Sequence, residues 1–150
     1  MQTITTNSED ETIRLGAQMG QSFKQGAVIA LVGSLGAGKT TLIRGMCRGM
    51  GFGGDVTSPS YNLMNIYKGG LTVHHFDLYR LNKTEELDDL GYEEYFFSGK
   101  GVTLIEWADR AAEKLPKTAL VIEMELISES ERKISFIAAE SYDFSGKHFD

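Results

Sequence analysis

Residues 33–40 constrain the fold of this chain more than any other segment. They read Gly-Ser-Leu-Gly-Ala-Gly-Lys-Thr, which follows the pattern G-x-x-x-x-G-K-[ST]. They come directly after an uninterrupted apolar run at 28–32 that is rich in β-branched residues. Glycines in this pattern let successive backbone N–H groups turn toward one phosphate group, and the next helix adds the positive end of its dipole. The segment therefore predicts a phosphate-binding loop between a buried strand and a helix.

Two side chains at the end of this loop carry the expected chemistry. Lys39 would reach the β- and γ-phosphate oxygens, and the hydroxyl of Thr40 would bind Mg²⁺. We therefore expect the chain to bind Mg-ATP or a close analogue. Thr41 could contact the α-phosphate, although a threonine on the helix surface is nearly as good an interpretation. The residues expected to contact the nucleotide here are Gly33, Ser34, Leu35, Gly36, Ala37, Gly38, Lys39, Thr40 and Thr41.

The rest of the chain alternates between expected helices and strands. Ser8 and Glu11 have the spacing of a capping box, Gly69 and Gly70 suit a hairpin turn, and Pro116 ends a helix. The expected strands are 28–32, 63–67, 71–78, 102–105, 119–126 and 134–138, and the expected helices are 9–24, 39–50, short ones within 85–97, and 107–115. This order predicts an α/β fold of the P-loop NTPase class, a three-layer sandwich with a mixed, mostly parallel central sheet, in a single domain at 1–150.

Composition narrows the classes of function. A chain of 150 residues with 41% hydrophobic content can bury one core. Its net charge of −6 argues against a protein that grips nucleic acid unaided, because phosphate contacts depend on clustered Lys and Arg. The single cysteine, Cys47, excludes an intrachain disulfide and is expected to be buried on a helix. With no signal-like start and no membrane-length apolar run, we expect a cytoplasmic protein that does not bind membranes.

Two acidic residues stand where a phosphate-binding loop of this kind needs a partner. Glu106 follows the apolar run 102–105, and Asp77 lies near the end of the expected strand 71–78. Open α/β sheets place their ligands at the carboxyl ends of strands, where a carboxylate can hold hydrated Mg²⁺ or orient an attacking water. Position alone leaves open which acid has which role. Each could instead be a solvated or helix-capping residue.

Several other residues near these segments give weaker indications of a functional role. The segment 57–60, Thr-Ser-Pro-Ser, follows the loop by about 20 residues, where segments that sense a γ-phosphate usually lie, but by itself it is a turn. His74 and His75 should point to opposite faces of a strand. We expect structural or surface roles for both, because no other His or Cys completes a metal site. Trp107 is most simply a core residue.

Four segments, taken in order, resemble one protein family. They are G-S-L-G-A-G-K-T-T at 33–41, T-S-P-S-Y at 57–61, H-F-D-L-Y-R-L at 75–81 and L-I-E-W at 104–107. Together they are similar to the TsaE family, formerly YjeE, the bacterial ATPase of tRNA threonylcarbamoyladenosine synthesis. The resemblance in length and element order covers most of the chain. Each segment alone is unspecific, and the combination is specific.

The resemblance implies an ATP-hydrolysing subunit. Such a subunit supports the TsaB and TsaD proteins as they form N6-threonylcarbamoyladenosine in tRNAs that read ANN codons, and it meets tRNA only indirectly. The resemblance also implies that Lys39 and the loop amides hold the phosphates of ATP or ADP. Thr40 and Glu106 would bind Mg²⁺, and Asp77 would help to activate water. The implied catalytic residues are Lys39, Asp77 and Glu106.

The same resemblance also implies which residues lie near the nucleoside part of ATP. It implies that the stretch around Glu9 and the segment near Arg132 flank the base or the ribose. This sequence departs from the family pattern at Ser34, where Asp is frequent, and at Ser60 and Tyr61, where Thr-Phe is more usual. These changes are mild and leave the phosphate chemistry intact.

Two other functions would use the same loop. A small-molecule kinase would transfer the γ-phosphate to a bound hydroxyl, but such kinases normally carry an arginine-rich lid, and after Trp107 this chain has only Arg110 and Arg132. A nucleotide-gated binding protein would hydrolyse ATP negligibly and use the bound state to set its affinity for a partner. A GTPase is disfavoured, because N-K-T-E at 82–85 ends in Glu rather than Asp.

Overall fold

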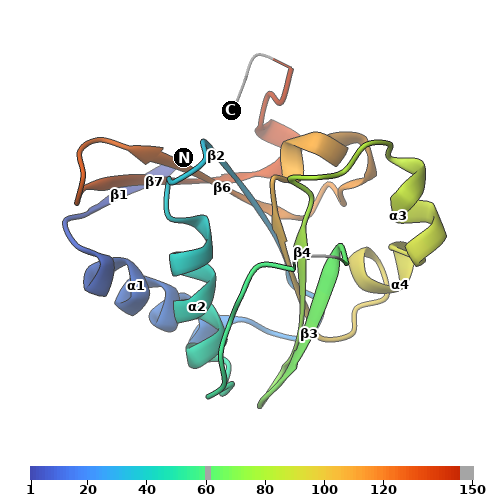
Figure 1. The fold of residues 1–150 in the computed structure, drawn as a ribbon, viewed down its shortest axis with the longest axis horizontal. Coiled ribbons are helices and arrows are strands. Elements are labelled where there is room, and N and C mark those ends of the chain that lie inside the picture. Colours follow the sequence, from blue (N-terminus) through green and yellow to red (C-terminus); the bar gives the residue numbers. More distant parts are fainter. Residues whose placement is uncertain (60–61, 146–150) are drawn as a thin grey trace.

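All strands of the structure belong to one sheet. The computed structural model describes residues 1–59 and 62–145. Its strands are β1 (Gln2–Thr6), β2 (Val28–Gly33), β3 (Met64–Lys68), β4 (Thr72–Asp77), β5 (Val102–Glu106), β6 (Leu120–Leu126) and β7 (Arg132–Ala138). Their spatial order is β1-β7-β6-β2-β5-β4-β3 (Figure 1). The central strands β6, β2, β5 and β4 are parallel, and antiparallel pairings join β1, β7 and β3 at the edges.

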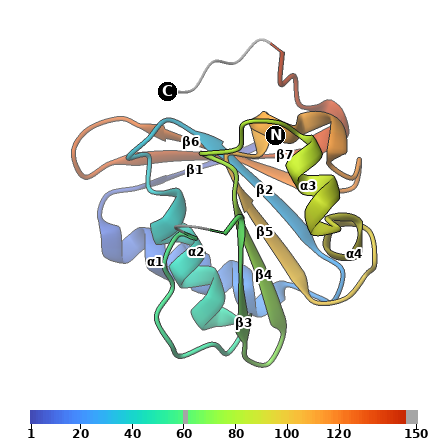
Figure 2. The ribbon, with the colours of Figure 1, turned by 45° about the vertical axis from the view of Figure 1, so that its right-hand side comes forward.

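Helices cover both faces of this sheet. The helices α1 (Glu9–Ser22) and α2 (Lys39–Gly49) lie on one face, and α3 (Glu85–Leu90) and α4 (Glu93–Phe96) lie on the other (Figures 1 and 2). The 3₁₀ helix η1 (Ala108–Lys114) packs on the same side as α3, and a short 3₁₀ turn, η2 (Ala139–Ser141), follows β7. The predicted three-layer α/β sandwich with a mixed, mostly parallel sheet is confirmed.

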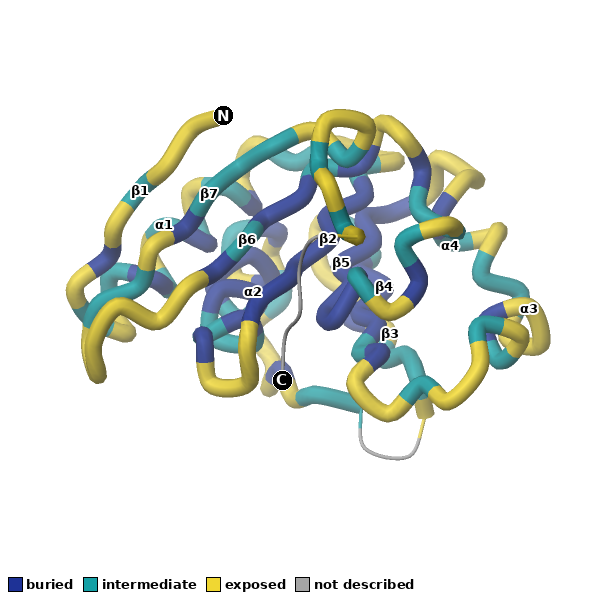
Figure 3. The backbone as a smooth tube through the Cα atoms, turned by 90° about the horizontal axis from the view of Figure 1, so that it is seen from above, coloured by how far each residue is buried: buried dark blue, intermediate teal, exposed yellow. Residues whose placement is uncertain are grey.

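The two faces of the sheet have separate cores. Along β2, Ile29 and Leu31 pack toward α1 and α2, while Ala30 and Val32 pack toward η1 and α3. Every residue of β2 and β5 is buried, as expected for parallel strands with helices on both sides (Figure 3). This explains why both strands are continuous apolar runs in the sequence.

Glycines bring α1 and α2 unusually close together. A Cβ atom on Gly16 would collide with the Leu42 carbonyl oxygen of α2, and one on Gly45 would collide with the Ile13 carbonyl oxygen of α1. The glycines that make this contact are Gly16, Gly20, Gly45 and Gly49. The contact holds the N-terminus of α1 beside the start of α2.

Two elements differ from the sequence-based expectation. β1 was not expected, because its Gln-Thr-Ile-Thr-Thr sequence is mostly polar, and it forms by pairing antiparallel with β7. The helix expected at 107–115 is present at 108–114, but it is a 3₁₀ helix and not a regular α-helix. Trp107 has a left-handed φ of 57°, and the 3₁₀ helix η1 that follows is kinked at Ala111. The expected cap of α1 is confirmed, since the Ser8 hydroxyl accepts from the Glu11 N–H at 3.1 Å.

The helices in the described part of the chain are too short or too polar for a bilayer. None of those within 1–59 and 62–145 combines the length and the apolar character that crossing a membrane requires. Cys47, as expected, is buried on α2, and burial raises the pKa of its thiol to about 12.

Gly45→Ala is expected to destabilise the protein. The added methyl group must displace the α1 backbone, and overpacking of this kind costs about 1–3 kcal/mol, which outweighs the roughly 1 kcal/mol gain in helix propensity. Urea denaturation followed by circular dichroism measures the change. Gly53→Ala is the matched control, because a Cβ at Gly53 meets nothing within 4 Å. Equal stability of the two variants would contradict the close helix contact.

Candidate functional site

The glycine loop between β2 and α2 lies at the carboxyl edge of the sheet. Gly36 and Gly38 have φ values of 83° and 98°, in the left-handed region that favours glycine. Gly33, at the end of β2, leaves room for the Met124 carbonyl oxygen of β6, which a Cβ would strike. The loop therefore needs glycine at these positions for its shape, and its backbone turns directly into the N-terminus of α2.

Lys39 lies across this loop. Its Nζ donates to the Gly33 carbonyl at 2.6 Å and to the Ser34 carbonyl at 2.9 Å. The same nitrogen lies 4.1 Å from the centre of the Trp107 ring, and the residue is only 4% exposed. Neutral carbonyls and an aromatic face are weaker partners for an ammonium than a phosphate oxygen. The position of Lys39 therefore fits a phosphate group above the loop.

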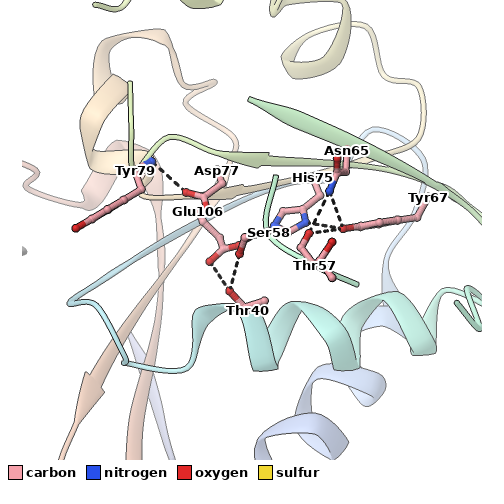
Figure 4. Close-up of polar contacts among 9 residues, drawn as sticks. All are labelled: Thr40, Thr57, Ser58, Asn65, Tyr67, His75, Asp77, Tyr79 and Glu106. Carbon is pink, nitrogen blue, oxygen red and sulfur yellow. Dashed lines mark hydrogen bonds and ion pairs between the residues drawn. The ribbon is translucent and has the colours of Figure 1, made fainter. Parts of the chain in front are cut away.

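The carboxylates Asp77 and Glu106 end neighbouring strands at the same edge. β4 and β5 are parallel and in register, so that Asp77 pairs with Glu106 across the ladder. The Thr40 hydroxyl donates to Glu106 Oε1 at 2.9 Å, and the His75 Nε2–H donates to Glu106 Oε2 at 2.6 Å (Figure 4). Asp77 Oδ1 accepts from the Tyr79 N–H at 3.0 Å. Three polar side chains predicted from sequence, Thr40, Asp77 and Glu106, are thus brought together.

The side chains that could bind a metal ion here suit Mg²⁺, which needs few protein ligands. They do not suit a metal ion that is bound by protein side chains alone. In the part of the chain that the structure describes, no group of three or more His, Cys, Asp or Glu side chains is arranged to hold a metal ion. Mg²⁺ usually takes only one or two protein carboxylates and completes its octahedron with water and substrate phosphates. The hydroxyl of Thr40 and the carboxylate of Glu106, beside a phosphate-binding loop, have this character.

Burial and charge shift the titration of the groups around the loop. Burial lowers the pKa of the Lys39 ammonium. The carboxylates that oppose this shift are Glu106, Asp109 and Asp77. The pKa of Asp77 is raised, first by burial and then by the negative charge of Glu106, and burial also raises the pKa of Asp109. Clusters of perturbed groups in a cleft are typical of functional sites.

Two adjoining cavities extend from the loop. One, of about 340 Å³, is lined by Lys39, Thr40, Asp77, Glu106 and Trp107 among others. The second, of about 470 Å³, is lined by Ser8, Glu9, Thr12, Glu129 and Ser130. Residues that line both are Gly38, Thr41 and Arg132. The structure therefore brings Glu9 and Arg132, far apart in sequence, to the same side of the loop.

The other residues predicted to contact the nucleotide or to sense its phosphate differ in where they lie. Ser34, Leu35 and Gly36 lie at the exposed tip of the loop, and Leu35 and Gly36 line the smaller cavity. The side chain of Ala37 is buried in the core under the loop, so only its backbone can face a ligand. Ser60 of the expected switch segment, with the neighbouring Tyr61, lies outside the described residues.

Two neighbours of the site, His75 and Trp107, have contacts that the sequence patterns do not predict. His75 was expected to be structural or at the surface, and it is fully buried against Glu106. Trp107 is buried as expected, yet its ring also covers Lys39. The signal for His75 was its spacing, because residues two apart on a strand share a face and Asp77 follows it by two. The left-handed backbone at Trp107 has no signal in the sequence.

Asp77→Asn is expected to stabilise the ligand-free protein at neutral pH. A carboxyl whose pKa is raised in the folded state contributes its stability below its ordinary pKa and loses it as the pH rises through the raised value. Parent and variant should therefore unfold alike in acid. At neutral pH the variant should melt about 2–4 °C higher, the shift expected for roughly 1 kcal/mol. Melting curves across this pH range measure it.

The matched control for this change is Asp89→Asn, which removes an exposed carboxyl from α3. It should follow the parent at every pH. The same gain in both variants, or none in Asp77→Asn, would contradict the desolvated environment of Asp77.

Comparisons with known proteins point to one family. The family model described as "Threonylcarbamoyl adenosine biosynthesis protein TsaE" matches residues 6–134. The chain is 36% identical to the TsaE protein of Treponema pallidum over 87% of this chain and 96% of that protein. It is 39% identical to TsaE of Bacillus subtilis, over 89% and 83% of the two chains. The crystal structure of Bacillus subtilis YdiB superposes with a TM-score of 0.76 at 34% identity, covering 92% of this chain and 85% of that one. With its P-loop fold and its match over most of its length, the chain belongs to the TsaE family of tRNA threonylcarbamoyladenosine biosynthesis proteins.

Proposed function

We propose that this protein is a magnesium-dependent ATPase that supports TsaB and TsaD in forming N6-threonylcarbamoyladenosine in tRNAs that read ANN codons. The observation that carries the proposal is the convergence of Lys39, Thr40, Asp77 and Glu106 on one cavity of about 340 Å³ beside the glycine loop. A phosphate cradle, two oxygen ligands and a second carboxylate are the groups that hydrolysis of a nucleoside triphosphate needs.

Each side chain has a separate role in this proposal. Lys39 and the loop amides bind the β- and γ-phosphates, and Thr40 and Glu106 would hold Mg²⁺. When bound, Mg²⁺ would supply positive charge to the phosphate oxygens. Asp77 orients the attacking water or accepts its proton, and its raised pKa makes it a better base than an ordinary aspartate.

The larger cavity would take the nucleoside end of ATP or ADP. Glu9 reaches it from the start of α1, and Arg132 reaches it from the start of β7. The Arg132 Nη1 donates to the carbonyls of Ser128 and Glu129, each at 3.1 Å, and these contacts orient the guanidinium, which lines the cavity. Glu9 lies 3.5 Å from Arg44 of α2. These two side chains would flank the base or the ribose.

The negative net charge of the chain supports a role in which the partner proteins, and not this chain, contact the tRNA. With a net charge of −6, the protein is poorly suited to bind a polyanionic tRNA by itself. In the proposed role, TsaB and TsaD contact the tRNA and carry out the transfer, and this subunit supplies ATP hydrolysis in the cytoplasm. The negative surface then matters little for tRNA recognition.

Turnover of ATP by the purified protein, alone and with TsaB and TsaD, tests the function. We expect slow turnover alone, a rise with both partners, and weaker turnover of GTP. Lys39→Ala should lower the rate by about 100-fold or more, because it removes a donor to the charge that develops on the phosphates. Acceleration by a small hydroxylated compound, without effect of the partners, would favour a kinase instead. Nucleotide binding that alters partner affinity without turnover would indicate a nucleotide-gated binding protein.

Glu106→Ala is expected to separate metal binding from nucleotide binding. Magnesium-dependent hydrolysis should fall by about 100-fold or more, because removing even an outer partner of a metal ligand costs about 10–100-fold. ADP affinity measured in EDTA should change by less than about threefold, because Lys39 and the loop amides remain. Glu125→Ala, which removes an exposed carboxylate from β6, is the control. Equal loss of both properties in Glu106→Ala would indicate misfolding and count against the assigned role.

A further inference from the structure

The carboxylate of Glu106 is held at both oxygens. It is only 3% exposed, and its two oxygens accept hydrogen bonds from side chains of two other elements, Thr40 of α2 and His75 of β4. A carboxylate with a single partner could rotate about its terminal bond, and two donors on opposite sides prevent this rotation. His75 therefore keeps Oε1 directed at Thr40 when it binds Oε2.

His75 is itself held in one orientation. Its side chain is fully buried, and a carboxylate can only accept, so the ring carries a proton on Nε2. This leaves Nδ1 facing the Tyr67 hydroxyl at 3.0 Å. The Tyr67 ring packs against Phe52, with ring centres 4.8 Å apart. The imidazole is thus fixed from both nitrogens, and Tyr67 sets its angle.

The same contacts reach the segment after α2. The Tyr67 hydroxyl also lies 2.9 Å from the Thr57 carbonyl, so its single proton is shared between that carbonyl and His75 Nδ1, and the amide of Asn65 donates to the same carbonyl at 3.1 Å (Figure 4). On the other side, the Ser58 hydroxyl lies 3.3 Å from that of Thr40. A continuous series of hydrogen-bonding groups therefore links Thr57 to Glu106 through Tyr67 and His75.

We propose that His75 is a positioning residue for the metal ligand Glu106, and that Tyr67 orients His75 and connects it to the backbone at Thr57. The inference rests on the function proposed above and adds residues outside the cavity that determine how well it holds Mg²⁺. A buried histidine that only fills space in the core would not need a 2.6 Å hydrogen bond to a carboxylate at the site. Partners of this kind typically change metal affinity by about 10–100-fold.

Two amide substitutions separate positioning from packing. In His75→Gln the amide nitrogen lies as many bonds from Cβ as Nε2 and can donate to Glu106, whereas in His75→Asn it replaces Nδ1 and can reach only Tyr67. Calorimetry of ADP binding, with Mg²⁺ and in EDTA, gives the enhancement of affinity by the metal. We expect His75→Gln to stay within about threefold of the parent and His75→Asn to lose about tenfold or more, with similar affinities in EDTA.

A second measurement needs neither metal nor nucleotide. In protein labelled with ¹⁵N at histidine, the proton on His75 Nε2 should resonate downfield of the backbone amides, and Glu106→Ala should remove or move this signal. If His75→Gln and His75→Asn bind Mg-ADP alike, or if the ring signal does not respond to Glu106→Ala, the role of His75 is wrong while the ATPase proposal stands. A parent protein without any magnesium dependence would overturn both.

Discussion

The in-register parallel pairing of β4 with β5 is the constraint on which the site depends. It sets Asp77 beside Glu106 at the carboxyl edge of the sheet, and the pairing of β5 with β2 sets both beside the glycine loop. A shift of one residue in either ladder would turn one carboxylate into the opposite core. The complete burial of β2 and β5 makes such a shift costly, so packing of the core also fixes the geometry of the site.

Close helix packing extends the site beyond the phosphate loop. The glycine contact between α1 and α2 places the start of α1, with Glu9, next to the start of α2, where the loop ends. The antiparallel pairing of β1 with β7 ties the strand before α1 to the one that begins with Arg132. The second cavity thus depends on contacts between the first part of the chain and the last.

Charged groups at the site are kept in place at some cost to stability. Lys39 and Glu106 are both nearly inaccessible to solvent, and the raised pKa of Asp77 shows that its ionised form is disfavoured by burial and by Glu106. Such an arrangement stabilises the folded chain poorly, but it can favour a ligand that brings phosphate and a divalent cation together. In the proposed function, the network from Thr57 to Glu106 would give the magnesium site its rigidity.

The sequence by itself determined the loop, the strand–loop–helix order and the carboxylates that end strands, because the G-x-x-x-x-G-K-[ST] pattern and buried apolar runs are local signals. It also suggested, although only through family resemblance, that Glu9 and Arg132 flank the base or the ribose of the nucleotide. Tertiary structure alone decided the polar strand β1, the left-handed Trp107 before a 3₁₀ helix, and the contacts of His75 with Glu106 and Tyr67. The physical reason is that these features arise from strand pairing and packing between residues distant in sequence, and such contacts override local propensity.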